Sequence, residues 1–311
     1  MTPEASPLVS VVIPTFNYGH FVTEAVDSAL AQTYRPVEVV VVDDGSTDDT
    51  RARLGPYRDR ITYVHQPNRG LSAARNAGVA RARGPVIALL DADDQFHPRK
   101  LELQMAYLAA HPAVGLVACE SFEDPALRWP AVDPAGGPAT PVGLRALVTR
   151  SRFAPSSVAV RKACLDAVGP FDPALRSAED RDMWIRVAAR FPVARVEAPL
   201  CWYRVQPGSM SHNPDRMERY ERVVLDRAFA LPPLRGARVL RRKALSEAAA
   251  AAAYMHLVAG RPWAAARRLA RSVRLWPLPY PRADTRTPLA RLKLSARVAG
   301  RALRPLSGSH P

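Results

Sequence analysis

The sequence predicts a doubly wound α/β domain followed by a basic, helical extension. Short β-branched runs alternate with segments whose apolar residues recur at helical spacing. Several of these runs are too continuously apolar to face water, which is typical of parallel strands covered by helices on both faces. After about Pro232 the composition changes to segments of Ala, Arg and Leu broken by prolines, which indicates a second, helical region.

The alternating elements fill the first 120 residues or so. Strands are expected over residues 8–13, 37–42, 61–65, 86–90 and 114–118. Helices are expected over residues 21–30, 72–83 and 98–110. Residues 125–141 are rich in Pro, Gly and Ala and predict a loop or flap. With the boundary near Pro214–Pro233, we expect a catalytic domain of residues 1–215 and an extension of residues 216–311.

The charge distribution separates the two regions. The formal net charge is +15, yet residues 1–210 are balanced, with 23 basic and 23 acidic residues. Residues 211–311 contain 21 basic and 6 acidic residues, so the whole excess lies in the last third. This asymmetry indicates that the two regions do different jobs.

Cysteine usage and hydropathy suggest a compartment. Three cysteines lie far apart without metal-ligand spacing, which favours reduced, structural thiols. The first residues do not read as a signal peptide, and no run of eighteen apolar residues occurs. We therefore expect a cytoplasmic location, with peripheral docking at the inner face of the membrane as a further expectation.

Acidic residues follow two of the buried strands. Asp43-Asp44 ends the second strand and Asp91-Ala92-Asp93-Asp94 ends the fourth. Open α/β sheets bind ligands at the carboxyl ends of their strands, so these acids are candidate site residues. A polar turn with a helix N-cap would also explain them. Burial argues against that simpler explanation, because desolvating several acids costs several kcal/mol unless they are compensated.

Each acidic motif has a specific chemical interpretation. Oxygen ligands at the 91–94 motif suit Mg²⁺ or Mn²⁺ shared with phosphate oxygens. Asp44 is able to accept hydrogen bonds from a nucleobase, while Ser46 or Thr47 is expected to cap the next helix. Asp180 stands at the start of an expected helix and is a candidate general base. The alternative for Asp180 is a favourable charge at a helix N-terminus.

Taken together, the motifs resemble one family. The blocks are VSVVIPTFNYGHFVTEAVDSALAQTY, VEVVVVDDGSTDDT, NRGLSAARNAGVARARGPVIALLDADD, SSVAVRKACLDAVGPFD, AEDRDMWIRV and WYRVQPGSMS. In this order they are similar to family 2 glycosyltransferases with a GT-A fold, over about residues 8–211. The resemblance implies a nucleotide-diphospho-sugar transferase-like mixed sheet and an inverting transferase.

The resemblance also implies the role of each candidate residue. Thr15 and Asp44 would contact the nucleobase, and Arg75 would approach the nucleotide. Asp91 and Asp93 would form a DxD element that touches the ribose and holds a divalent metal, Mg²⁺ or Mn²⁺.

The resemblance also implies roles for residues near the acceptor and the diphosphate. Asp180 would deprotonate the acceptor hydroxyl during a single in-line displacement. Tyr203, Arg204 and Ser209 match the later block, which in relatives shapes the diphosphate side of the site. The implied partners are a nucleoside diphosphate sugar donor and a hydroxyl acceptor, either a saccharide or a lipid-linked glycan, in polysaccharide or glycoconjugate biosynthesis.

Two segments of the extension have helical amphipathicity with basic flanks. Their apolar positions are Trp263, Ala266, Ala270 and Val273 in one, and Leu289, Leu292, Ala296, Ala299 and Leu303 in the other. Such helices suit an anionic membrane surface. Packing of the apolar faces against the catalytic domain is the alternative. No nucleic-acid partner is expected, because the sequence shows no recognisable reading motif and few stacking aromatics.

Two other functions remain as alternatives. A sugar-nucleotide nucleotidyltransferase should carry a Gly-rich, basic triphosphate loop near the N-terminus, and VVIPTFNYGH has none. A non-catalytic membrane-surface scaffold that retains the fold would show no turnover, and its Asp180→Asn variant would behave as wild type.

Overall fold

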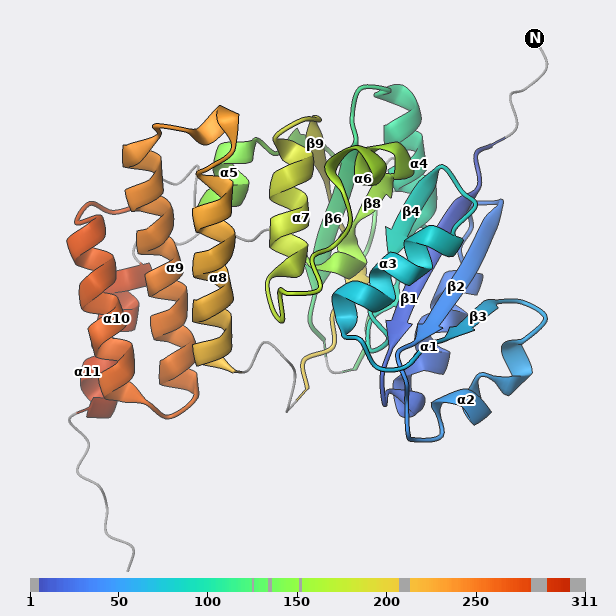
Figure 1. Ribbon diagram of the computed structural model, residues 1–311, viewed down its shortest axis with the longest axis horizontal. Coiled ribbons are helices and arrows are strands. Elements are labelled where there is room, and N and C mark those ends of the chain that lie inside the picture. Colours follow the sequence, from blue (N-terminus) through green and yellow to red (C-terminus); the bar gives the residue numbers. More distant parts are fainter. Residues whose placement is uncertain are drawn as a thin grey trace, which may run out of the picture. The chain divides into compact units, whose positions relative to one another are not determined.

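The computed structural model describes residues 6–124, 126–133, 136–150, 153–206, 213–280 and 290–302. The chain divides into two compact units (Figure 1). The first comprises Met1–Gly143 and Arg152–Gln206, and the second comprises Leu144–Ser151 and Pro207–Pro311. The division that we expected at residue 215 did not foresee that Leu144–Ser151 leaves the first unit and joins the second.

The first unit is built on one mixed sheet. Its strands are β1 (Val9–Thr15), β2 (Val37–Asp43), β3 (Thr62–His65), β4 (Val86–Leu89), β5 (Gln95–Phe96), β6 (Leu116–Phe122), β7 (Ala139–Pro141), β8 (Ala159–Arg161) and β9 (Val193–Trp202). The strand order is β3-β2-β1-β4-β8-β6-β9-β5, and β7 pairs with β9. The β1–β2, β1–β4, β2–β3 and β6–β9 pairs are parallel, whereas β8 runs antiparallel between β4 and β6.

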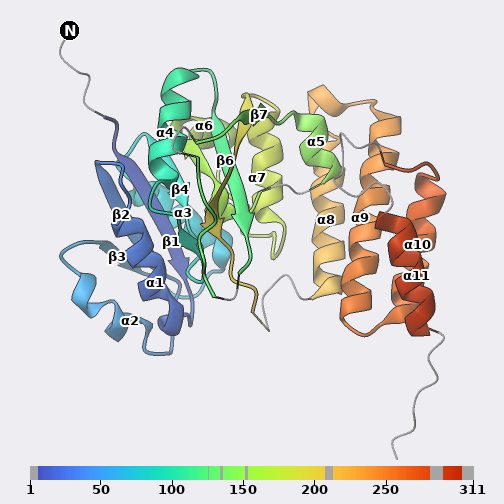
Figure 2. The same cartoon turned by 180° about the vertical axis from the view of Figure 1, so that it is seen from behind.

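Helices connect these strands and cover both faces of the sheet (Figure 2). They are α1 (Gly19–Leu30), α2 (Thr50–Arg53), α3 (Leu71–Arg81), α4 (Lys100–Ala110), α6 (Lys162–Val168) and α7 (Glu179–Ala188), with 3₁₀ turns at Gly55–Tyr57 and Pro155–Ser157. The five strands and three helices expected in the first 120 residues are confirmed to within a few residues at each end. Four strands, β5, β7, β8 and β9, were not expected, and the antiparallel pairs made by β5, β7 and β8 make the sheet mixed.

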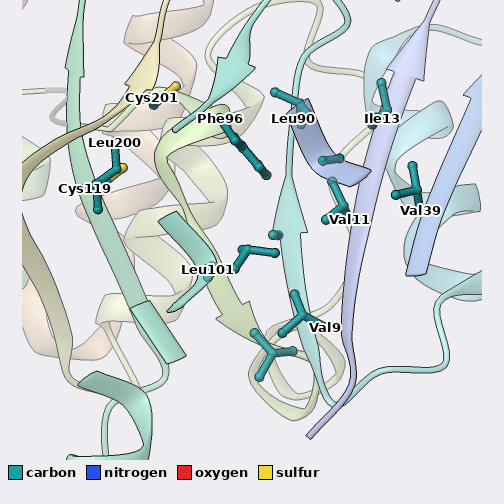
Figure 3. Close-up of a cluster of buried hydrophobic side chains, with 14 of the residues drawn as sticks. Val9, Val11, Ile13, Val39, Leu90, Phe96, Leu101, Cys119, Leu200 and Cys201 are labelled. Carbon is teal, nitrogen blue, oxygen red and sulfur yellow. The ribbon is translucent and has the colours of Figure 1, made fainter. Parts of the chain in front are cut away.

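The alternation of valines along β1 and β2 explains the two layers. Val9, Val11 and Ile13 belong to the core cluster that includes α1, and Figure 3 shows them lined up along β1. Val40 and Val42 of β2 point to the other face, where they meet α3. All seven residues of β1 are buried, as the continuous apolar run predicts.

A glycine lets α3 approach the sheet closely. A Cβ at Gly78 would lie 2.3 Å from Cγ1 of Val12, so the strand and the helix are packed nearer than any side chain at residue 78 would allow. This packing fixes the position of α3, which carries Arg75.

The second unit is helical. It contains α5 (Leu144–Thr149), α8 (Pro214–Ala228), α9 (Arg238–Val258), α10 (Pro262–Leu275) and α11 (Ala290–Ala302), with a 3₁₀ turn at Pro232–Leu234. Its small core joins α9, α10 and α11 through Ala253, Leu257, Ala265, Leu269, Leu294 and Val298. Leu289 and Leu303, two of the apolar positions that we expected on the last helix, lie outside the described residues. No helix in the described part of the chain is both long and apolar enough to cross a bilayer.

One buried histidine sits among charges in this unit. His256 of α9 is 1% exposed, and its Nε2 lies 3.6 Å from Oδ1 of Asp215 and 3.7 Å from Oε2 of Glu218, both on α8. Arg268 of α10 donates to Glu218 at 2.7 Å. Burial, and then the nearby Arg268, lower the pKa of His256, although the two acids act in the opposite direction.

Candidate active site

The loops that follow β1 and β2 are tied to each other. Asn17 is in the left-handed region at φ 57, where asparagine is tolerated. Its backbone N–H donates to Oγ of Ser46 at 2.9 Å, and its side-chain oxygen accepts from the N–H of Thr47 at 2.7 Å. The expectation that Ser46 or Thr47 caps the next helix is therefore wrong. Asp49 is the N-cap position of α2, and Ser46 and Thr47 are used to join the two loops.

Asp44 also accepts hydrogen bonds from the loop that follows β3. It is 3% exposed and its backbone N–H donates to the carbonyl of Thr15 at 2.8 Å. Its carboxylate accepts from Nε2 of Gln66 at 2.6 Å and from the N–H groups of Arg69 and Gly70 at 2.9 and 2.7 Å. A carboxylate offers about four lone-pair sites, so three protein donors leave room for one more. Asp44 thus shapes the loop after β3 and keeps one acceptor position.

Thr15 adjoins Asp44 at the end of β1. Its side chain is buried, and its Oγ1 has no hydrogen-bond partner among the described residues. Buried hydroxyls are nearly always hydrogen-bonded, so an orphaned one at the end of a strand needs an explanation. A bound ligand group would supply the missing partner.

The acidic loop after β4 is held by residues from distant segments. Oγ of Ser156 accepts from the N–H of Asp91 at 3.0 Å and donates to Oδ2 of Asp94 at 2.5 Å. The other Asp94 oxygen accepts from the N–H of Arg204 at 3.0 Å. Oδ2 of Asp93 accepts from Nε2 of Gln206 at 2.7 Å. Asp94 is therefore a buried anchor, whereas Asp91 and Asp93 keep exposed surface.

Arg204 closes the acidic loop from the end of β9. Its Nε donates to the carbonyl of Asp93 at 2.9 Å, and its guanidinium pairs with Glu24 of α1. The same group lies over the rings of Phe21 and Trp202, 4.0 and 4.4 Å from their centroids. Of the later block, Arg204 therefore reaches the acidic loop, while Ser209 lies outside the described residues.

Arg75 links the acidic loop to the start of α7. The side chain is 1% exposed; Nη2 donates to Oδ1 of Asp91 at 2.7 Å, and Nη1 donates to Oε1 of Glu179 at 2.5 Å. Phe171 lies beneath the guanidinium, 5.7 Å away. The neighbouring carboxylates raise the pKa of Arg75 against the effect of burial, so the cation is retained. Because both terminal nitrogens are engaged, the geometry favours a positioning role for Arg75.

Asp180 occupies the first turn of α7, directly after Glu179. It is half-buried, and its Oδ1 accepts from the backbone N–H of Arg181 at 2.7 Å. The preceding Ala178 has φ 60, an unusual conformation for a residue with a Cβ, which sets the entry into the helix. Asp180 is also close enough to Arg75 to raise its pKa. Asp91, Arg75 and Asp180 therefore belong to one cluster.

The electrostatics of the acidic loop indicate a site for positive charge. Burial and then the Asp91 carboxylate raise the pKa of Asp93 to about 6. Tyr18, in the loop after β1, has a pKa raised to about 12 by burial and by the carboxylates of Asp93, Asp91 and Asp94. Crowded carboxylates with raised pKa values are stabilised by a nearby cation.

The donor set fits a divalent cation that is shared with a ligand. No three His, Cys, Asp or Glu side chains are arranged as a complete metal cage in the described ranges. Mg²⁺ and Mn²⁺ need no such cage, since one or two carboxylates suffice when water and phosphate oxygens complete the shell. Asp93 and Asp91 could supply those carboxylate oxygens.

Sequence reasoning missed three residues of this site. Ser156, Gln206 and Tyr18 surround the acidic loop, and all three lie inside the blocks that carry the family resemblance. Their positions in those blocks were the available signal. Nothing local marks a serine as the partner of an aspartate 62 residues away.

Comparisons with known proteins relate this chain to glycosyltransferases. The family model for glycosyl transferase family 2 matches residues 10–156. An uncharacterized glycosyltransferase of Rickettsia prowazekii is 43% identical over 103 residues, which is 33% of this chain and 32% of that protein. Chondroitin synthase of Escherichia coli is 41% identical over 100 residues, 31% of this chain and 15% of that protein. The matches thus span at most a third of these relatives' own length.

A solved structure shares the fold. The mannosyltransferase PcManGT from Pyrobaculum calidifontis, in complex with GDP-Man and Mn²⁺, aligns with a TM-score of 0.59 at 24% identity, over 99% of this chain and 89% of that one. At this identity the alignment shows that the two chains share a fold. Residues 10–156 therefore match the glycosyl transferase family 2 model, and the chain has the GT-A fold.

Proposed function

We propose that this chain transfers a sugar from a nucleoside diphosphate donor to a hydroxyl acceptor by metal-assisted in-line displacement with inversion. The observation that carries the proposal is the cluster of Asp91, Arg75 and Glu179-Asp180. It joins an acidic loop suited to a diphosphate with a helix N-terminus that carries a candidate base.

The nucleotide end of the donor would lie over the loops after β1 and β2. The orphaned Thr15 hydroxyl and the remaining acceptor position of Asp44 are the groups available to a nucleobase. Phe16, which is 42% exposed, adds an aromatic face beside them. Because the strand-end loops are already tied together, this cradle would be preorganised for the donor.

Asp91 and Asp93 would bind the ribose and, with the donor phosphates, hold a divalent cation. When bound, that cation would neutralise charge on the departing diphosphate. Arg75 would orient Asp91. Only the N–H groups of Arg75 that do not bond to Asp91 or Glu179 would be available to the nucleotide. Gln206 and Ser156 would fix the loop that presents both carboxylates.

Asp180 would act as the general base. Its carboxylate would take the proton of the acceptor hydroxyl while the acceptor oxygen forms a bond to the anomeric carbon. The bond between that carbon and the diphosphate oxygen breaks in the same step, and the diphosphate leaves. Attack opposite the leaving group gives a product of inverted configuration.

The acceptor is proposed by class. A saccharide or a lipid-linked glycan in polysaccharide or glycoconjugate assembly supplies the required hydroxyl. The relation to chondroitin synthase supports a polysaccharide role, although that match covers a small part of the relative. An anionic membrane surface is the proposed location of such an acceptor.

Release of free nucleoside diphosphate tests the proposal. UDP-, GDP- and dTDP-sugars would be offered to the protein with Mn²⁺ or with chelator, with saccharide acceptors present. We expect metal-dependent release from one donor, lost in Asp93→Ala and reduced at least about 100-fold in Asp180→Asn, which lacks the base. Asp59→Asn, which changes an exposed acid on the same domain, serves as the matched control and should leave turnover unchanged.

Measuring donor binding by calorimetry shows whether a variant loses turnover because it no longer binds the donor or because the chemical step fails. Asp180→Asn should bind the donor as wild type does, whereas Asp93→Ala should lose the metal-dependent part of binding. If no donor binds and no donor is turned over, the transferase proposal fails and a non-catalytic scaffold becomes the better explanation. Wild-type turnover in Asp180→Asn would reject Asp180 as the base while leaving the enzyme class intact.

A further inference from the structure

The helical unit carries most of the exposed apolar surface of the described chain. Nine large hydrophobic side chains are exposed among the described residues, and seven of them belong to this unit: Val239, Tyr254, Val258, Trp263, Val273, Leu278 and Leu292. The same unit holds the whole positive excess of the sequence. Exposed apolar side chains and excess positive charge therefore occur in the same unit.

The exposed face of α10 shows how the two kinds of side chain are arranged. Its buried face consists of Ala265, Leu269 and Ser272. Trp263, on the opposite face, is 67% exposed, and Val273, beside the buried face, is 43% exposed. At 100° per residue, the exposed Ala270 lies beside Trp263, and the exposed Arg267 and Arg274 lie on the other side of the indole. Of the stripe expected from the sequence, Trp263, Ala270 and Val273 are exposed, whereas Ala266 is partly buried and packs against the core of the unit.

Helix α11 repeats this arrangement. Leu294 and Val298 pack into the core of the unit, so one apolar face is used for folding. Leu292 is 67% exposed and lies on the other side of the helix, where Ala296 and Ala299 are exposed as well. Lys293 and Arg297 flank this second stripe. Packing of α11 on its own unit and an exposed basic-apolar face therefore coexist.

The charges of these two helices are unbalanced. Neither α10 nor α11 contains an acidic residue, and the sequence has none between Glu247 and Tyr280. Arg268 and Arg271 pair with Glu218 of α8. The guanidinium of Arg291 donates hydrogen bonds to the backbone carbonyls of Trp276 and Leu278. Four exposed cations, Arg267, Arg274, Lys293 and Arg297, have no ion-pair partner within the described ranges.

We infer that the exposed stripes of α10 and α11 dock on a lipid bilayer that carries anionic headgroups. Unpaired cations beside the stripe attract the headgroups, and the apolar residues enter the interface, with the Trp263 indole at headgroup depth. A nucleic acid would use the cations but would leave the aliphatic stripe exposed to water. The docking stands apart from the proposed transfer chemistry, so either can fail without the other.

Vesicle binding of the full chain tests this inference. Wild type should cosediment with vesicles of phosphatidylcholine mixed with phosphatidylglycerol and should bind pure phosphatidylcholine weakly. Arg267→Glu combined with Arg274→Glu should weaken binding at least about 30-fold, since each basic residue near the surface contributes about fivefold or more. Arg58→Glu combined with Arg60→Glu is the matched control, because it makes the same change in net charge on exposed residues of the first unit.

The apolar contribution is measured with Trp263→Ser. Because the indole is exposed, this variant should keep the wild-type circular dichroism and still lose affinity for anionic vesicles at high salt, where the electrostatic part is screened. The blue shift of fluorescence on vesicle binding should disappear with it. Equal loss of binding in the control double variant, or wild-type binding in the α10 variants, would overturn the proposal. So would binding of a single-stranded RNA through the same arginines without any binding of vesicles.

Discussion

The buried ion pair between Arg75 and Glu179 offers a sharp test of how α3, β4 and α7 are held together. The two charged atoms are 2.5 Å apart, and the side chains are 1% and 8% exposed. Arg75→Met leaves the Glu179 carboxylate buried without its partner, and breaking such a pair costs about 3–5 kcal/mol. Glu179→Gln costs less, about 1.5–3 kcal/mol, because Arg75 still pairs with Asp91.

A double-mutant cycle measures the coupling. The double variant Arg75→Met with Glu179→Gln should lose less free energy of unfolding than the two single variants lose together. The difference should be about 1–3 kcal/mol, because the second change removes the orphaned charge. Urea unfolding followed by fluorescence gives each free energy of unfolding, with an unchanged m-value as the check. The exposed pair Arg53–Asp49, whose closest contact is 2.7 Å, is the control and should couple by about 0.5 kcal/mol or less. Additive losses in the buried pair would refute the role assigned to it.

Three further predictions concern other parts of the molecule. Ser156→Ala should slow turnover and raise the metal concentration needed for half activity, while Ser156→Thr should restore both, because the hydroxyl holds the acidic loop after β4. Gly78→Ala should lower the free energy of unfolding by about 1–3 kcal/mol through the clash with Val12, whereas Gly55→Ala, which meets nothing within 4 Å, should cost little. His256 has a lowered pKa when folded, so its contribution opposes folding as pH falls below the unfolded pKa of about 6.5. His256→Gln should therefore flatten the loss of stability on the acid side, and an unchanged pH profile would contradict this.

The acids of the site were accessible to sequence reasoning because their signals are local. Asp44, Asp91 and Asp93 follow continuous apolar runs, and the carboxyl ends of parallel strands converge on one edge of the sheet. Asp180 was found from the periodicity of the helix behind it. The partners of these acids carried no such signal. Ser156 and Gln206 reach them through contacts that depend on the order of strands.

In the helical unit, too, some features have a local sequence signal and others depend on packing. The amphipathic stripes of α10 and α11 could be read from their spacing, but each helix has apolar residues on two sides. Periodicity does not say which side is covered, because that depends on which helix packs next to it. The structure buries Leu294 and Val298 and leaves Trp263 and Leu292 exposed.

The sequence by itself determined the α/β alternation, the family and the acids at the strand ends, since these depend on hydropathy and turn chemistry within a few residues. The tertiary structure decided the antiparallel insertion of β8 between β4 and β6, the transfer of Leu144–Ser151 to the helical unit and the pairing of Arg75 with Glu179. That pair joins residues 104 positions apart. Contacts over such separations are selected by the packing of the whole domain, which no local pattern encodes.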